Sequence, residues 1–157
     1  GCSDSRVPPN LFTGMEIGEM FVHRNIANIV SRYDHNIMSA IQYSVETLKV
    51  KHIAICGHYG CGGVKASMED NLVGDLGKWV RAIKTVQNIN YKELNAITDE
   101  EERLNRLVEL NIFEQANNVF KISYVQKSIK AFGFPSVHGW VYNMQTGKLI
   151  DLKLEFK

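Results

Sequence analysis

Two short stretches of the sequence bring together residue types that bind metal ions. Cys2 and Asp4 stand near the start of the chain, and His58 and Cys61 lie three residues apart further along. Two thiolates, an imidazole and a carboxylate form a tetrahedral ligand set of the kind that zinc takes. Arg6 could hold the carboxylate away from the metal as a bidentate clamp. Because one ligand can then be replaced, the pattern predicts a catalytic zinc site. A structural site closed by Asp4 stays open as the alternative.

The residues around His58 and Cys61 predict the carboxyl end of a buried strand. The apolar run 51–56 is typical of a parallel strand covered on both faces. A glycine-rich loop follows, and then a short helix, 64–69. Open α/β sheets carry their sites at the carboxyl ends of strands. A neighbouring parallel strand that ends at Cys2 would therefore bring the two stretches together.

The rest of the chain predicts an α/β fold with a central, mostly parallel sheet flanked by helices. Apolar residues at helical spacing and a capping-box sequence at 98–101 indicate the helices, and apolar runs next to turns indicate the strands. The expected helices are 36–50, 72–89 and a long helical block from 98 to 132 that ends at Gly133; the expected strands are 20–23, 137–142 and 149–154, with a turn at 145–147.

Composition and charge exclude several classes of protein. The chain has 157 residues, enough for one domain with a real core, and a net charge of +1 without a basic block. No nucleic-acid or anionic-membrane partner is therefore expected. No apolar run reaches the roughly 18 residues that span a bilayer. Three cysteines argue against a disulfide framework. We expect reduced thiols and a cytoplasmic protein, although the missing initiator Met leaves a targeting segment possible.

Four short motifs of the sequence match those of a known family. The chain resembles the β-class carbonic anhydrases along nearly its whole length, and the motifs that carry the resemblance are Cys2–Pro8, Phe21–Asn28, Cys56–Gly63 and His138–Trp140. The resemblance implies one catalytic domain over residues 1–157 and a homodimer, which assembles into a tetramer or larger particle in some members. Because only one residue precedes Cys2 here, we expect the N-terminal helical arm of the family to be absent.

The resemblance also implies roles for individual residues. It implies that Zn²⁺ is bound by Cys2, His58 and Cys61, and that Asp4 and Arg6 form a catalytic dyad. In a closed state of the site, the aspartate becomes the fourth zinc ligand.

Further residues match the family's substrate pocket and a regulatory site. Phe21, Ile26 and Tyr43 match an apolar pocket built across a dimer interface, although by default such residues belong to the core. Arg24 matches an arginine of a non-catalytic bicarbonate site in some members.

The function implied by the resemblance is the reversible hydration of carbon dioxide to bicarbonate and a proton by zinc-bound hydroxide. One alternative is a carbon disulfide or carbonyl sulfide hydrolase of the same family. Another is a non-catalytic zinc protein that binds bicarbonate. A nucleotide-binding domain is the weakest alternative, because the segment 57–65 lacks the Gly-Lys-Ser/Thr end of a phosphate loop.

Overall fold

A three-stranded sheet with helices on both sides forms the centre of the computed structural model, which describes residues 1–156 of the expected domain. The strand order is β1-β2-β3. Strand β1 (His52–His58) runs parallel to β2 (Ser136–Asn143), and β2 forms an antiparallel hairpin with β3 (Lys148–Asp151). The α/β class is therefore confirmed, and the predicted strand at 51–56 corresponds to β1. The expected parallel neighbour that ends at Cys2 is wrong, because β1 pairs with β2 and Cys2 forms only an isolated parallel bridge with Asn25.

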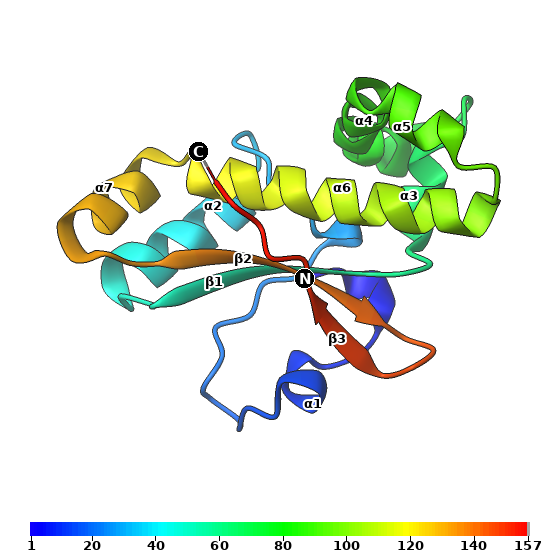
Figure 1. The fold of residues 1–157 in the computed structure, drawn as a ribbon. Coiled ribbons are helices and arrows are strands. Elements are labelled where there is room, and N and C mark those ends of the chain that lie inside the picture. The colour runs from blue at the N-terminus through cyan, green and yellow to red at the C-terminus, as the bar shows by residue number, and fades with distance from the viewer. Residues whose placement is uncertain (157) are drawn as a thin grey trace.

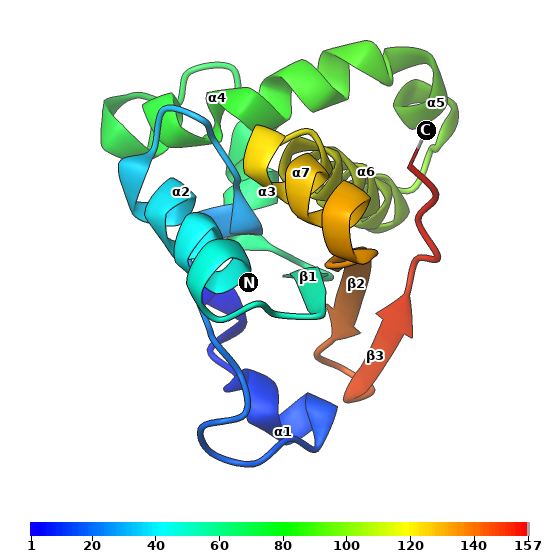
Figure 2. The same cartoon turned by 90° about the vertical axis from the view of Figure 1, so that its left-hand side faces the viewer.

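Most of the helices lie on one side of this sheet, and α1 lies on the other (Figures 1 and 2). The longest, α6, packs across β1 and β2 and buries Ile112, Ala116 and Val119 completely. The α-helices are α1 (Pro9–Thr13), α2 (His35–Gln42), α3 (Gly62–Ser67), α4 (Gly74–Ile89), α5 (Tyr91–Ala96), α6 (Glu100–Phe120) and α7 (Ser123–Phe132). No helix among residues 1–156 is long and apolar enough to cross a membrane.

The helical block predicted at 98–132 begins and ends close to the predicted residues, but it consists of two helices, α6 and α7. Asp99, not Thr98, is the N-cap of α6, and its carboxylate accepts a hydrogen bond from the Glu102 amide at 2.8 Å. The block separates into α6 and α7 at 121–122 because Ile122 leaves the helical region of the backbone. Gly133 ends α7 in the left-handed conformation, as its position predicted.

The predicted strand at 20–23 is wrong. This segment belongs to no strand, and an isolated bridge nearby joins Asn25 to Cys2. A strand needs a backbone partner along its length. Here the predicted strand pairs with residues 1–3 only at its end, through residues 23–25. The pairing is limited to three hydrogen bonds between the backbone of residues 1–3 and that of residues 23–25.

Candidate metal centre

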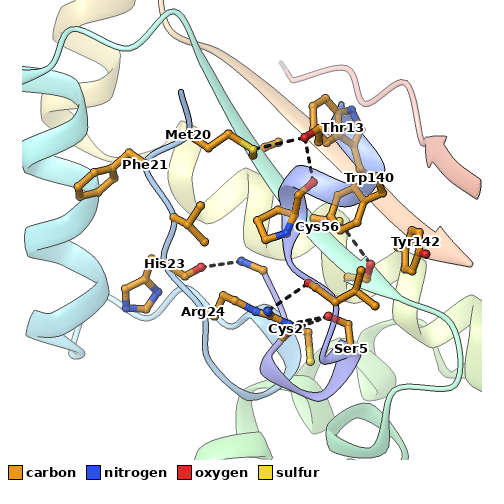
Figure 3. Close-up of a pocket in the computed structure, with 17 residues that line it drawn as sticks. Cys2, Ser5, Thr13, Met20, Phe21, His23, Arg24, Cys56, Trp140 and Tyr142 are labelled. Atoms are coloured by element: carbon orange, nitrogen blue, oxygen red, sulfur yellow. Dashed lines mark hydrogen bonds between the residues drawn. The ribbon is translucent and has the colours of Figure 1, made fainter. Parts of the chain in front are cut away.

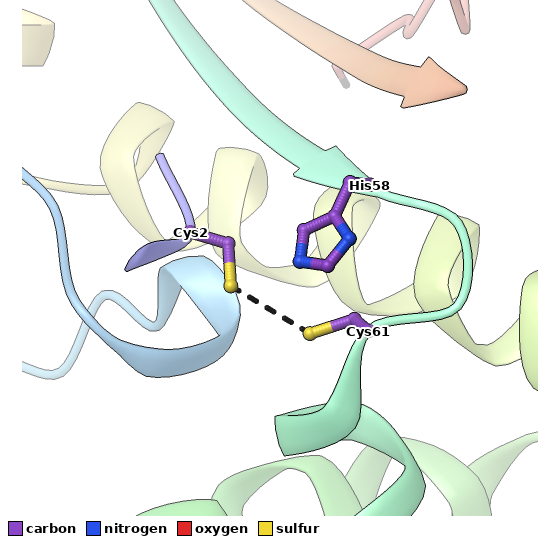
Figure 4. A group of neighbouring side chains, drawn as sticks. All are labelled: Cys2, His58 and Cys61. Atoms are coloured by element: carbon purple, nitrogen blue, oxygen red, sulfur yellow. Dashed lines mark hydrogen bonds between the residues drawn. The ribbon is translucent and has the colours of Figure 1, made fainter. Parts of the chain in front are cut away.

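Cys2, His58 and Cys61 meet at one buried point, as Figure 4 shows. Their ligand atoms all lie within 4.8 Å of one another, and the two sulfur atoms are 3.6 Å apart. All three residues are at most 2% exposed. The structure thus brings together the three residues that the sequence singled out as fixed ligands.

The imidazole of His58 is oriented as a metal ligand requires. Its Nδ1 lies 3.0 Å from the carbonyl oxygen of Tyr59, so that Nδ1 carries the proton and donates it. Its Nε2 is buried and has no hydrogen-bond partner among residues 1–156. A histidine whose second nitrogen is fixed by a backbone carbonyl is the usual form of a metal-binding histidine. The unpartnered nitrogen and the two thiols next to it fit zinc.

The two cysteine sulfurs are in hydrogen-bond contact, which shifts their pKa values in opposite directions. The hydrogen bond from Cys61 lowers the pKa of Cys2 to about 4, against the effect of burial and with help from His58. The same contact, together with burial, raises the pKa of Cys61. Burial opposes the charged form of His58, but its contact with Cys2 raises the pKa of the imidazole. The site thus already stabilises one thiolate, the form that binds metal ions.

The segment that carries Cys2 is held mainly by hydrogen bonds to its backbone and sulfur. Arg24 donates from Nη2 to the carbonyl oxygen of Cys2 at 2.7 Å and to the hydroxyl of Ser5 at 2.7 Å. The amide of Ala27 donates to the sulfur of Cys2 at 3.2 Å. Ala27 reaches this position with a positive φ of 61°, an uncommon conformation for a residue with a side chain.

The segment that carries His58 and Cys61 is held by regular structure. His58 is the last residue of β1, and Cys61 is the N-cap of α3. Between them, the amide of Gly60 donates to the side chain of Asn105 on α6 at 3.1 Å. The hydroxyl of Tyr59 donates to Glu109, also on α6, at 2.6 Å, and burial together with this carboxylate raises the pKa of Tyr59 to about 12.

Asp4 lies beside the cluster with its carboxylate held from two directions. Its Oδ2 accepts a hydrogen bond from the amide of Gly62 at 2.8 Å and lies 3.9 Å from Nε2 of His58. Its Oδ1 lies 3.2 Å from Nη2 of Arg6, whose Nε donates to the backbone carbonyl of Asp4 at 2.7 Å. The expectation that Arg6 binds both carboxylate oxygens of Asp4 is therefore wrong. Arg6 binds one carboxylate oxygen and the backbone carbonyl of Asp4.

Comparison with known proteins agrees with this geometry. The family model described as carbonic anhydrase matches residues 1–149. The chain belongs to the β-carbonic anhydrase family. A carbonic anhydrase of Emericella nidulans is 53% identical over 156 residues, which are 99% of this chain and 68% of that protein. One of Candida albicans is 33% identical over 98% of this chain and 55% of its own length.

Solved structures of β-carbonic anhydrases share the fold. A structure from a study of two tetrameric β-carbonic anhydrases of Sordaria macrospora matches with a TM-score of 0.93 and 40% identity, over 100% of this chain and 80% of that one. The Coccomyxa enzyme in complex with acetazolamide matches with a TM-score of 0.91 and 38% identity, over 97% of this chain and 69% of that one. The expected enzyme class is thus confirmed at the level of the family.

The residues predicted to form a substrate pocket lie at the surface of this chain. Phe21 is 50% exposed and Tyr43 is 51% exposed, with ring centroids 6.0 Å apart. The default expectation that these aromatics belong to the core is wrong for both. Ile26 is partly buried, and its backbone carbonyl accepts a hydrogen bond from Trp79 at 2.8 Å. Their role in a pocket between two copies stays a prediction.

Arg24 lines a cavity of about 100 Å³, shown in Figure 3, to which Cys2 and Phe21 also contribute. Trp140 and Tyr142 line it from β2 and Cys56 from β1, a grouping that sequence reasoning missed. The alternation of side chains along a strand could have placed the two aromatic residues on one face. The terminal nitrogens of Arg24 already donate to the N-terminal segment, including the carbonyl of Val7 at 3.1 Å. A bicarbonate site at Arg24 stays a prediction.

Proposed function

We propose that this protein catalyses the reversible hydration of carbon dioxide to bicarbonate and a proton, with a zinc ion bound by Cys2, His58 and Cys61. The observation that carries the proposal is the buried, unpartnered Nε2 of His58 beside two thiols, with all ligand atoms within 4.8 Å. Family membership supports the reaction, since the relatives reported above are named carbonic anhydrases.

The donor set determines the pH range in which the site can act. Zinc lowers the pKa of a water that it binds from about 15.7 to about 7, which supplies a nucleophile near neutral pH. The thiolates of Cys2 and Cys61 cancel the formal charge of the ion, and the local charge sets how far that pKa falls. We therefore expect activity that rises with pH above neutral.

Asp4 is placed to direct the attacking oxygen. Its Oδ2 lies near Nε2 of His58 and is held by the amide of Gly62, so the carboxylate borders the cluster without entering it. There it would accept a hydrogen bond from the attacking oxygen and orient a lone pair of that oxygen toward carbon dioxide. Arg6 keeps Asp4 in this position. If that contact is lost, Asp4 can turn inward and become a fourth ligand.

The apolar substrate is held by Phe21, Ile26 and Tyr43 at a contact between two copies of the chain. The half-exposed state of both aromatic rings supports this proposal, because a second copy would cover them. A homodimer, or a larger assembly of dimers, follows from it. The reduced cysteines also favour a cytoplasmic location.

The test is carbon dioxide hydration by the zinc-loaded protein, measured by stopped flow between about pH 6 and 9, the range that brackets the expected titration. We expect the rate to rise across this range. Asp4→Ala should keep its zinc and lose about 100-fold in rate, the scale of a positioned proton-accepting group. Asp75→Ala is the matched control, because its carboxylate is fully exposed on α4.

Three results would overturn the proposal. One is a rate that stays flat across this pH range. Another is full activity in Asp4→Ala. The third is turnover of carbonyl sulfide without turnover of carbon dioxide, which would favour the hydrolase alternative.

A further inference from the structure

The amide of Ala27, which donates to the sulfur of Cys2, is held in place from outside the cysteine–histidine cluster. Ala27 is completely buried and has a φ of 61° and a ψ of 25°. Residues with a side chain rarely adopt this left-handed conformation, and it persists only where the surrounding contacts enforce it. Here those contacts come from two helices, α4 and α6.

A tryptophan of α4 binds the same peptide group that carries this amide. Nε1 of Trp79 donates to the carbonyl oxygen of Ile26 at 2.8 Å. The peptide bond between Ile26 and Ala27 is trans, so its C=O and its N–H point in opposite directions. Trp79 therefore fixes one end of the peptide plane, while the other end points at the sulfur of Cys2 over an N···S distance of 3.2 Å.

Two hydrogen bonds in series connect the indole of Trp79 to the sulfur of Cys2 through this peptide group. A peptide whose carbonyl oxygen accepts a hydrogen bond is polarised, and its N–H becomes a better donor. A donor that points at a thiolate stabilises its negative charge, and the thiolate is the form that binds metal ions. The hydrogen bond of Trp79 can thus act on the sulfur through the peptide.

Two buried side chains of α6 hold the peptide group that follows. Nδ2 of Asn111 donates to the carbonyl oxygen of Ala27 at 3.0 Å, and its Oδ1 accepts from Nε2 of Gln115 at 2.9 Å. Oε1 of Gln115 accepts from the amide of Val30 at 2.9 Å. Asn111 and Gln115 are both 1% exposed. Burying an amide costs free energy unless its hydrogen bonds are made, and here these bonds hold the backbone at 27–30.

We propose that Trp79 and Asn111 are positioning residues of the metal centre, which hold the amide of Ala27 against the sulfur of Cys2. The inference rests on the proposed function, because it takes Cys2 as a zinc ligand. Trp79 binds the carbonyl before Ala27, and Asn111 binds the carbonyl of Ala27 itself. Loss of either bond leaves all three proposed ligands in the chain but frees the amide to turn away from the sulfur.

The test compares Trp79→Phe with Tyr124→Phe in the full chain, loaded with cobalt in place of zinc. Each change keeps an aromatic ring and removes one donor to a backbone carbonyl. The hydroxyl of Tyr124 donates to the carbonyl of Met38 on α2 at 3.1 Å, so this variant is the matched control. A weaker hydrogen bond raises the energy of the sulfur lone pairs. The thiolate-to-cobalt absorption band should therefore move to longer wavelength in Trp79→Phe and stay in place in Tyr124→Phe.

The affinity for zinc measures the same effect in a second way. Competition with a chelator should show a loss of about threefold for Trp79→Phe, less than the roughly 10- to 100-fold that changes next to a ligand cost. Tyr124→Phe should keep the affinity of the parent, although urea unfolding should destabilise both variants by similar amounts. Asn111→Leu should move the cobalt band in the same direction as Trp79→Phe. Because it acts from α6, it keeps the inference testable if Trp79→Phe folds poorly.

Two outcomes would overturn the inference. One is an absorption band that does not move in Trp79→Phe, which would mean that the indole only satisfies a buried carbonyl. The other is an equal loss of zinc affinity in Tyr124→Phe, which would mean that the affinity follows overall stability. The reaction itself is tested separately: bands that shift as expected in a protein that does not hydrate carbon dioxide would contradict the proposed function alone. A chain that binds neither zinc nor cobalt would contradict both.

Discussion

The two halves of the cysteine–histidine cluster are held in different ways. His58 and Cys61 come from the end of β1 and the start of α3, so a strand and a helix fix their backbone. Cys2 precedes only a short 3-10 turn, and the guanidinium of Arg24 binds its carbonyl oxygen. Regular elements distribute support over many hydrogen bonds, whereas the Cys2 segment has fewer, and Arg24 makes several of them. The Cys2 half should therefore be the more sensitive to single substitutions outside the cluster.

The largest effect is expected from the cysteines themselves. Cys2→Ser and Cys61→Ser each remove a proposed thiolate ligand, so both should lose zinc binding by more than the roughly 10- to 100-fold that changes around a ligand cost. Metal analysis after dialysis measures this loss directly. Cys56→Ser is the control, since Cys56 lies outside the cluster. Stoichiometric zinc in either cluster variant would contradict the ligand assignment.

The second largest effect on zinc binding is expected from Arg24→Met, which should weaken the Cys2 half of the cluster and leave the His58 and Cys61 half in place. The change keeps an unbranched apolar stem but removes the bonds to the carbonyl of Cys2 and the hydroxyl of Ser5. We expect zinc affinity to fall about 10- to 100-fold, as for other residues that orient a ligand. Competition with a chelator gives the affinity. Arg32→Met is the matched control, since Arg32 is exposed on the surface. Unchanged affinity in Arg24→Met would show that the Cys2 half is held by other contacts.

Gly63→Ala should push the two halves apart. A Cβ at Gly63 would lie 2.6 Å from Cγ2 of Ile26 and 3.2 Å from Cβ of Ala27, the residue whose amide binds Cys2. Overpacking of this kind costs about 1–3 kcal/mol. Urea unfolding of the zinc-loaded protein measures the loss in free energy of unfolding. A variant as stable as the parent would mean that the segment 26–28 can move at little cost.

Asn105→Ala should have the smallest effect, because it touches the better supported half. It removes the acceptor for the amide of Gly60 on the loop between His58 and Cys61. Loss of one such hydrogen bond costs about 0.5–1.5 kcal/mol in the free energy of unfolding. Zinc affinity should change less than in Arg24→Met. If both variants lost affinity equally, the proposed difference between the halves would be wrong.

The sequence predicted the parts of the fold that local patterns determine. The buried run of β1, the periodicity of α4 and the glycine that ends α7 all correspond to observed elements. The wrong strand at 20–23 and the missed break at 121–122 have one cause in common, and it is not a local pattern. Both depend on what the segment packs against, which no local pattern contains.

The sequence predicted which residues form the site, but it did not predict the hydrogen bonds that hold them in place. Cys2, His58 and Cys61 stood out because thiols and an imidazole at this spacing are specific. The hydrogen bond from the amide of Gly62 to the carboxylate of Asp4 joins residues that are 58 positions apart in the sequence. The contact of Asn105 with Gly60 likewise depends on where α6 crosses the sheet. Such supports become visible only once the chain is folded.

The amide of Ala27 should give a proton NMR signal that is sensitive to the metal centre. Its proton points at the sulfur of Cys2, which is a proposed ligand, over an N···S distance of 3.2 Å. Its nuclear resonance should therefore shift with the charge on that sulfur. In protein loaded with cadmium-113 instead of zinc, scalar coupling through the sulfur should split the same resonance. One backbone signal, buried at the centre of the molecule, would thus report the state of the metal without any substitution or dye.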